Sequence, residues 1–389
     1  MSSPLEGPLE IPEGMFDQAQ ELAAAVPADV SFGVGFKATG SELTDTVALV
    51  VYVPEKKPES ELSQEELIPR EFAGHPTDVV EWNPIPIEDS KAYEKLHGGI
   101  EIVPAPIPIG DVAGTGGIWV ERGGGTLGAI ARRRSDGVQV LLTASHVVME
   151  KGVLVGDIQQ PRHGAVIANT GSGTVERHDK GLDCAAVEPN GKRKLLGTVE
   201  GVGPVMGARR LSVKSLGVDV KKRGRTTELT TGQITAIKQT AIDEATLEMT
   251  IAPPRSGMRF AWEGDSGSVV LNTRDEVVGL LHHKIIPKWD PTQSLGVATL
   301  IDFVQDALAV DVLAMRPALK KGSKGGAVRL LQDGLVSAGY LSGPADGDFG
   351  RGTLAAVKKF QAKHAPPADG GVGRITWAKL AELGHVPWP

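Results

Sequence analysis

The sequence predicts a mainly β protein that ends in a small all-α domain, and two patterns carry this prediction. Between about residues 98 and 310, short apolar runs such as 138–143 and 246–251 alternate with turns rich in glycine, asparagine and charged residues. Strands at this close spacing, without long helical patterns between them, indicate an antiparallel barrel or sandwich. From residue 319 onward the apolar residues recur instead at the spacing of a helix face.

The chain has 389 residues, which is more than one hydrophobic core usually serves, so several domains are expected. The first part contains a helical segment, Met15 to Val26, and a run of β-branched and aromatic residues, Thr46 to Val53. We predict four parts, which are an α+β accessory region over residues 1–97, the β domain over 98–311, a linker over 312–318 and the all-α domain over 319–389.

Composition limits the functions and locations that are plausible. The net charge of −7 argues against a general nucleic-acid-binding surface. We expect no membrane span, since no apolar stretch reaches the roughly 20 residues that one needs. The single cysteine, Cys184, excludes an intramolecular disulfide. Residues 1–14 lack a basic start followed by an apolar run, so we expect a cytoplasmic protein, with the cell wall or the exterior, reached by a non-classical route, as the alternative.

Three short motifs in the β domain suggest nucleophilic catalysis. An apolar strand ends at His146, an aspartate, Asp183, opens a second apolar run, and Ser266 stands between glycines before a third. A serine hydroxyl becomes a good nucleophile when an imidazole removes its proton, and a carboxylate fixes the tautomer of that imidazole. The glycines leave room for the backbone amides of Gly264 and Ser266 to point at a developing oxyanion.

Each motif has an ordinary structural explanation when it is taken alone. A histidine at a strand end is more often structural than catalytic, and Gly-Asp-Ser-Gly also occurs in turns. Their joint appearance in the order His, Asp, Ser within an all-β region predicts a catalytic triad of His146, Asp183 and Ser266. We find no metal-ligand cluster in the sequence, so no metal and no cofactor are expected.

The motifs around these three residues resemble those of the chymotrypsin/trypsin-like serine peptidases. The stretch 222–232 is similar to the Gly-Arg-[Thr/Ser]-Thr-Gly-x-Thr-x-Gly segment of disulfide-free bacterial members and of plant narrow-leaf-type peptidases. The resemblance covers about residues 98–311 and implies a chymotrypsin-like double β-barrel, two perpendicular six-stranded barrels with the site in the cleft between them. Glu228 stands where relatives commonly have glycine.

The resemblance also suggests roles for neighbours of the triad. It implies an ion pair that holds Asp265 and keeps the oxyanion loop open, for which the cationic segment 222–225 is one candidate; the alternative is that these cations are solvated on a turn. We therefore expect the N-terminal region to stay attached in the active enzyme. Phe260, six residues before Ser266, is expected at the base of the substrate pocket, which predicts a preference for an uncharged residue, or else in the barrel core.

His282 matches the position that carries an aromatic platform beside the substrate, or is simply a strand residue near the cleft. Because neighbouring strand residues point to opposite faces, His282 and His283 are not expected to bind a metal together.

The C-terminal segment resembles the peptidoglycan-binding domain 1 family and implies a three-helix module. Its residues 346–353 recur in similar form as 369–376. The matching positions are Gly325, Val328, Leu331, Gln332, Leu335, Gly339, Tyr340, Asp346, Gly347, Phe349, Gly350, Thr353, Val357, Phe360, Gln361, Asp369, Gly370, Thr376, Trp377 and Leu380. The expected partners are therefore a protein or peptide substrate at the triad and peptidoglycan or a protein at residues 319–389.

The function that these patterns predict is that of a serine endopeptidase, which works through an acyl-enzyme and is targeted by a C-terminal binding module. The alternative is a catalytically silent trypsin-like scaffold that acts through this module. A cell-wall hydrolase would depend on the module alone, because the paired carboxylates or metal ligands of such enzymes are not found.

Overall fold

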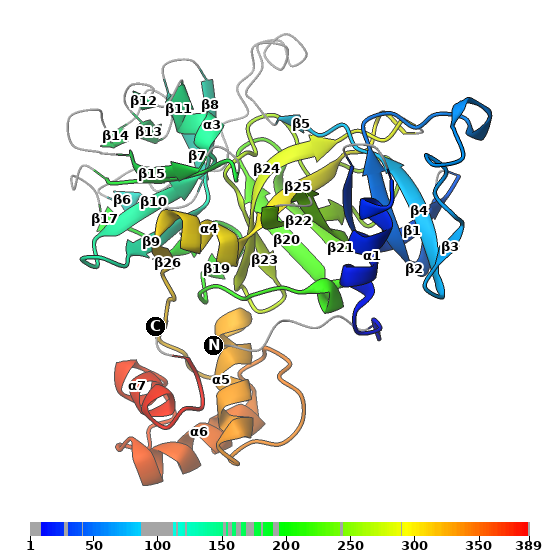
Figure 1. Cartoon of the computed structure of the whole chain (residues 1–389). Coiled ribbons are helices and arrows are strands. Elements are labelled where there is room, and N and C mark those ends of the chain that lie inside the picture. Colours follow the sequence, from blue (N-terminus) through cyan, green and yellow to red (C-terminus); the bar gives the residue numbers. More distant parts are fainter. Residues whose placement is uncertain are drawn as a thin grey trace.

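The computed structural model describes residues 9–26, 30–40, 42–86, 112–113, 116–120, 123–150, 153–154, 158–160, 165–168, 175–179, 182–189, 194–241, 244–288 and 290–387. It confirms the mainly β fold, which is followed by a helical C-terminal domain (Figure 1). Among the described residues, no helix is both long enough and apolar enough to cross a membrane.

A closed antiparallel barrel of six strands forms the second half of the β domain. Its order is β20-β23-β24-β25-β22-β21, and β21 returns to pair with β20. The strands are β20 (Asp219–Gly224), β21 (Glu228–Ala241), β22 (Glu244–Ala252), β23 (Val269–Asn272), β24 (Val277–Ile285) and β25 (Leu295–Leu300). Buried aliphatic residues of alternating positions, such as Ile234, Ile251 and Leu281, fill its interior.

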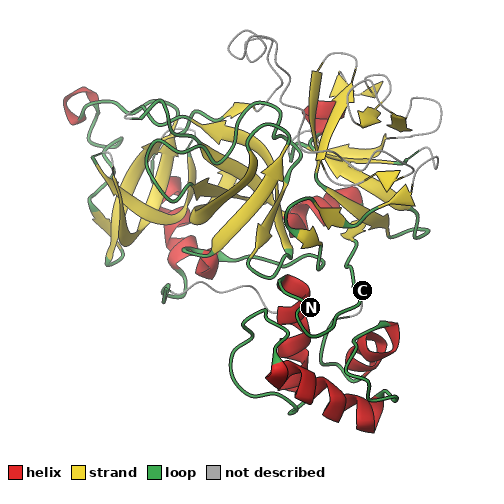
Figure 2. Ribbon diagram, turned by 180° about the vertical axis from the view of Figure 1, so that it is seen from behind, coloured by secondary structure: helices red, strands yellow, loops and turns green. Residues whose placement is uncertain are grey.

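The first half of the β domain consists, in the part that the structure describes, of a five-stranded and a four-stranded sheet beside this barrel (Figure 2). The former contains β15 (Val175–Asp179), β16 (Cys184–Val187), β10 (Gln139–Thr143), β9 (Ala129–Arg133) and β26 (Val310–Val312). The latter contains β14 (Ala165–Ala168), β13 (Ile158–Gln160), β7 (Gly116–Val120) and β8 (Gly123–Leu127). Helix α4 (Ile301–Leu308) packs its buried face, which includes Ile301 and Val304, against both halves.

The N-terminal region is joined to the six-stranded barrel rather than appended to it. Strand β1 (Ser31–Thr39) pairs antiparallel with the second half of β21, and β2 (Glu42–Val53), β4 (His75–Glu81) and β3 (Glu71–Phe72) extend the sheet. Helix α1 (Met15–Ala24) buries Met15 and Leu22 in the same core. At Gly33 a Cβ atom would lie 2.2 Å from the carbonyl oxygen of Ile237, so only glycine allows this approach.

The C-terminal domain contains α5 (Gly326–Ser337), α6 (Arg351–His364) and α7 (Arg374–Glu382) around a core of its own. The internal repeat of the sequence is a repeated clamp. The buried amide of Gln332 accepts from Gly347 N at 2.8 Å and donates to Asp346 at 2.7 Å, while Gln361 accepts from Gly370 N at 2.8 Å and donates to Asp369 at 3.3 Å. Each glutamine therefore fixes the loop before the next helix.

The linker expected over residues 312–318 begins within the β domain. Val312 belongs to β26, Leu313 N donates to Ile130 O at 2.9 Å, and Met315 N donates to Val205 O at 2.7 Å. The helical domain also touches the barrel, since Gly326 N donates to Asp275 at 2.8 Å.

Candidate active site

Paired strands bring His146 and Asp183 together. His146 lies in the short helix α3 (Ser145–Val148), directly after β10, and Asp183 directly precedes β16. These strands pair antiparallel with Thr143 opposite Ala185, so the end of one lies beside the start of the other. The His146 Nδ1 and Asp183 Oδ2 atoms are 2.5 Å apart, and the backbone N–H of His146 donates to Asp183 Oδ1 at 2.9 Å.

The two oxygens of Asp183 thus hold both the backbone and the ring of one histidine. Burial by itself raises the pKa of Asp183, but the hydrogen bonds and positive charge of His146 outweigh it and lower that pKa below its ordinary value. Asp183 has a φ of 48°, in the left-handed region. The carboxylate therefore stays ionised in a fixed orientation against the imidazole Nδ1.

Ser266 lies in a tight loop before β23. The flanking Gly264 and Gly267 have φ values of 90° and 87°, which only glycine adopts without strain. A Cβ atom on Gly267 would lie 2.3 Å from Thr126 O and also 2.3 Å from Thr143 Oγ1, so this loop is pressed against the strands that lead to His146. The Ser266 hydroxyl is fully buried and donates to His282 O at 3.2 Å.

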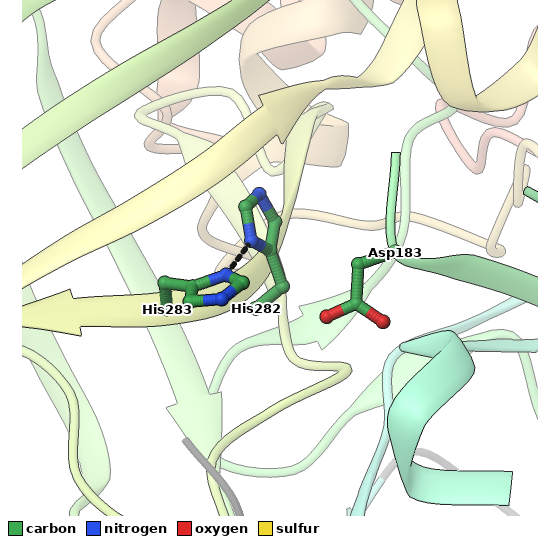
Figure 3. A group of neighbouring side chains, drawn as sticks. All are labelled: Asp183, His282 and His283. Atoms are coloured by element: carbon green, nitrogen blue, oxygen red, sulfur yellow. Dashed lines mark hydrogen bonds between the residues drawn. The ribbon is translucent and has the colours of Figure 1, made fainter. Parts of the chain in front are cut away.

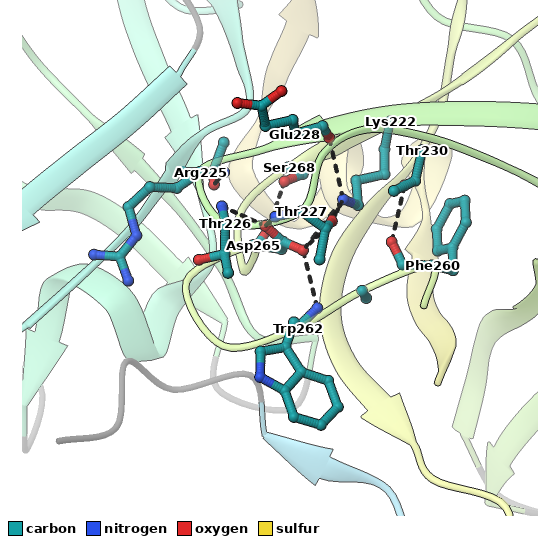
Figure 4. Close-up of polar contacts among 12 residues, drawn as sticks. Lys222, Arg225, Thr226, Thr227, Glu228, Thr230, Phe260, Trp262, Asp265 and Ser268 are labelled. Atoms are coloured by element: carbon teal, nitrogen blue, oxygen red, sulfur yellow. Dashed lines mark hydrogen bonds and ion pairs between the residues drawn. The ribbon is translucent and has the colours of Figure 1, made fainter. Parts of the chain in front are cut away.

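The carboxylate of Asp265 is held by a dense set of donors (Figure 4). Lys222 Nζ lies 3.2 Å from Oδ2, and the side chains of both residues are fully buried. The amides of Thr226, Thr227 and Trp262 donate to the same carboxylate at 2.8, 3.1 and 2.9 Å. The expected ion pair is confirmed for Lys222, so the N-terminal amine of a cleaved chain is not needed for this contact.

The departure at Glu228 has a backbone explanation. Glu228 adopts a φ of 55°, the left-handed conformation that a glycine would take without strain, at a cost of about 1 kcal/mol. Its carbonyl lies 3.4 Å from Lys222 Nζ. The loop geometry is therefore kept despite the different side chain. Desolvation lowers the pKa of Lys222, and the charge of Asp265 acts in the opposite direction.

Phe260 does not line an open pocket. It is 0% exposed, belongs to the barrel core, and its ring would be the first obstacle to a side chain at Gly232 or Gly296. The structure corresponds to the alternative in which Phe260 packs in the core, so the apolar preference inferred from it loses its basis. His282 is also buried, at 3% exposure.

The expectation that His282 and His283 point to opposite faces is wrong. The pairing of β24 with β25 shifts its register between Leu281 and His283, which breaks the regular alternation of the strand. As a result the Nδ1 atoms of the two imidazoles are in contact, with the rings edge to face and 4.7 Å between centroids. Burial and the neighbouring His282 lower the pKa of His283 to about 4.

Two features near Ser266 were not found in the sequence. Lys284, buried at the end of β24, forms an ion pair with Glu263 and lies 3.9 Å from the centre of the Trp262 ring. The signal was a lysine at the end of an otherwise apolar strand. The second feature is β5 (Ile85–Pro86), which pairs antiparallel with β24. A two-residue strand leaves no periodicity to detect.

Comparisons with known proteins agree with these parts. Residues 324–380 match the family described as "Putative peptidoglycan binding domain". An uncharacterized protein of Kitasatospora aureofaciens, from the bpoA1 3' region, is 48% identical over 65 residues, which are 16% of this chain. The chain spans 55% of the length of that relative.

Solved structures similar to the chain are serine proteases of the chymotrypsin type. A glutamic acid-specific serine protease is 17% identical with a TM-score of 0.39, and Thermobifida fusca Protease A is 17% identical with a TM-score of 0.38; both alignments cover 52% of this chain and 100% of the other. Cellulomonas bogoriensis chymotrypsin is 18% identical, with a TM-score of 0.36 and coverage of 51% and 97%.

Proposed function

We propose that the chain is a serine endopeptidase that hydrolyses peptide bonds through an acyl-enzyme. Ser266 Oγ attacks the carbonyl carbon, His146 takes the hydroxyl proton and gives it to the leaving amine, and Asp183 orients the imidazole. The amides of Gly264 and Ser266 stabilise the oxyanion. Water then releases the acyl group by the same route in reverse. The proposal rests mainly on the 2.5 Å contact between His146 Nδ1 and Asp183 Oδ2.

A fluorophosphonate tests this proposal directly, because it reacts with an activated serine and needs no knowledge of the substrate. We expect a single adduct, located on Ser266 by peptide mass spectrometry of the full-length chain. The absence of any adduct would favour the alternative, a catalytically silent scaffold that acts through its C-terminal domain.

Strand β5 supports a polypeptide as the substrate. Its Ile85 is paired with Lys284 and its Pro86 with His283, directly after His282, whose carbonyl accepts the Ser266 hydroxyl. A strand edge binds extended peptides by main-chain hydrogen bonds. An extended backbone beside Ser266 is therefore compatible with the site, and a substrate in that position competes with β5.

We expect Ile85→Pro to raise kcat/KM for a peptide substrate about tenfold. Proline removes one backbone donor from β5, and each lost hydrogen bond is worth about 1 kcal/mol to the strand that competes with the substrate. The measurement is kcat/KM on a fluorogenic peptide mixture. Glu55→Pro, in an exposed loop of the same region, is the control and should leave kcat/KM as it is. Equal kcat/KM in both variants would refute the competition.

We further propose that the helical domain directs the peptidase to a polymer or protein, with peptidoglycan the first candidate because of the match over residues 324–380. The domain has its own core, so binding and hydrolysis are separable.

Removing residues 317–389 is expected to change the hydrolysis of a small peptide ester less than twofold. The cut keeps the hydrogen bonds of Leu313 and Met315 to the β domain. The measurement is the initial rate with truncated and full-length chains at equal active-site titre, together with pelleting on purified peptidoglycan. A folded truncated protein without esterase activity would show that the helical domain contributes to the active site.

A further inference from the structure

Three possible metal ligands lie together beside the candidate triad. One ligand atom each from Asp183, His282 and His283 lies within 4.8 Å of the others, and Figure 3 shows the two imidazoles in contact, beside the carboxylate. The irregularity of β24 at His282 creates this arrangement, because a regular strand would separate the two rings.

The surrounding hydrogen bonds fix which nitrogen of His282 can accept a cation. The Thr299 hydroxyl donates its proton to Leu182 O at 3.2 Å, so it receives a hydrogen bond from His282 Nε2 at 3.0 Å. Glu248 Oε1 lies 3.5 Å from the same Nε2, and Lys238 in turn pairs with Glu248 at 3.2 Å. A neutral His282 therefore carries its proton on Nε2 and presents the Nδ1 lone pair to His283.

This is the second layer that metal-binding histidines commonly have, in which the ring nitrogen away from the ion donates to a carboxylate or another fixed acceptor. The Nδ1 of His283 faces a lone pair, so a proton must lie between the two nitrogens, or a cation must take its place. Two imidazoles and one carboxylate are a ligand set that suits Zn²⁺.

We propose that Asp183, His282 and His283 bind a divalent cation of the zinc class, and that this cation inhibits the enzyme. Asp183 is the shared residue, since its Oδ2 also contacts His146 Nδ1 at 2.5 Å. A cation that takes this oxygen removes the partner that orients His146. The inhibitory part rests on the proposed peptidase function, whereas binding of the cation does not.

Calorimetric titration of the full-length chain with ZnCl₂, and the visible absorption of Co²⁺ as a substitute ion, measure binding without reference to activity. We expect one strong site. His283→Gln is expected to weaken Zn²⁺ binding at least 100-fold, and Glu248→Gln about tenfold, because the second layer orients His282. His385→Gln, on the helical domain, is the matched control and should bind Zn²⁺ as the unchanged chain does.

Thermal unfolding of each variant establishes that it is folded, and Glu248→Gln provides an independent test if His283→Gln is not. Absence of Zn²⁺ binding by the unchanged chain, or equal binding by His283→Gln and His385→Gln, would overturn the site. Fluorophosphonate labelling with and without Zn²⁺ tests inhibition. Labelling that Zn²⁺ slows in the unchanged chain but not in His283→Gln supports it, and labelling unaffected by bound Zn²⁺ overturns it. Failure of labelling without Zn²⁺ concerns the proposed function and leaves the binding result standing.

Discussion

Ser266→Ala is expected to lower peptide turnover by about a millionfold and to abolish fluorophosphonate labelling. The substitution removes the one oxygen that can form the acyl-enzyme. The loop around it should remain intact, because its shape depends on Gly264, Gly267 and the donors to Asp265. The measurement is kcat on a peptide substrate together with the extent of labelling.

Ser268→Ala is the matched control. Ser268 is equally buried and lies in the same loop, but its hydroxyl donates to the Asp265 carbonyl, away from the reacting atoms. It should still be labelled on Ser266. Undiminished labelling of Ser266→Ala would show that another residue is the nucleophile.

Lys222→Met is expected to destabilise the fold by about 3–5 kcal/mol and to reduce turnover about 100-fold or more. Methionine leaves the Asp265 carboxylate without its only cationic partner among the described residues, in a place that is 0% exposed. The amides that surround the carboxylate remain, but they do not compensate a full charge. The loop that carries Ser266 should therefore shift, which the urea midpoint and kcat measure together.

Lys288→Met removes an ion pair of similar length, 2.7 Å to Glu81, whose lysine side chain is 79% exposed. Since solvent screens such a pair, the urea midpoint should hardly move. Lys222→Met with the stability and turnover of this control would show that the Asp265 pair does not hold the loop. The double variant Lys222→Met/Asp265→Asn should regain part of the lost stability, because it leaves no buried charge unpaired.

Much of the site could be predicted because its chemistry restricts residue types. The histidine at the end of β10 and the aspartate at the start of β16 are local signals, and antiparallel pairing brings such ends together. The cationic partner of Asp265 could be narrowed to a four-residue segment for the same reason. Only the structure shows that Lys222 fills this position and that Arg225 N instead donates to Thr126 at 2.9 Å.

Other features depended on register, which a local pattern does not encode. Phe260 was placed by counting back from Ser266, whereas the turn at Trp262 and Glu263 directs it into the core. The contact between His282 and His283 depends on one irregular residue in β24. The N-terminal region was expected as a separate part, and its union with the barrel arises from a pairing between β1 and β21 that no short-range periodicity reveals.

The pairing of β1 with β21 has a consequence for synthesis on the ribosome. Gly35 pairs with Ala236, so a strand made early waits for one made about 200 residues later. At about 5–20 residues per second, that wait lasts on the order of 10–40 s. During this time the apolar face of β1 and β2, with Phe32, Val34 and Leu49, has no barrel to cover it. The nascent chain is then a natural client for a chaperone that binds exposed strands, and the peptidase assembles only when the second barrel leaves the exit tunnel.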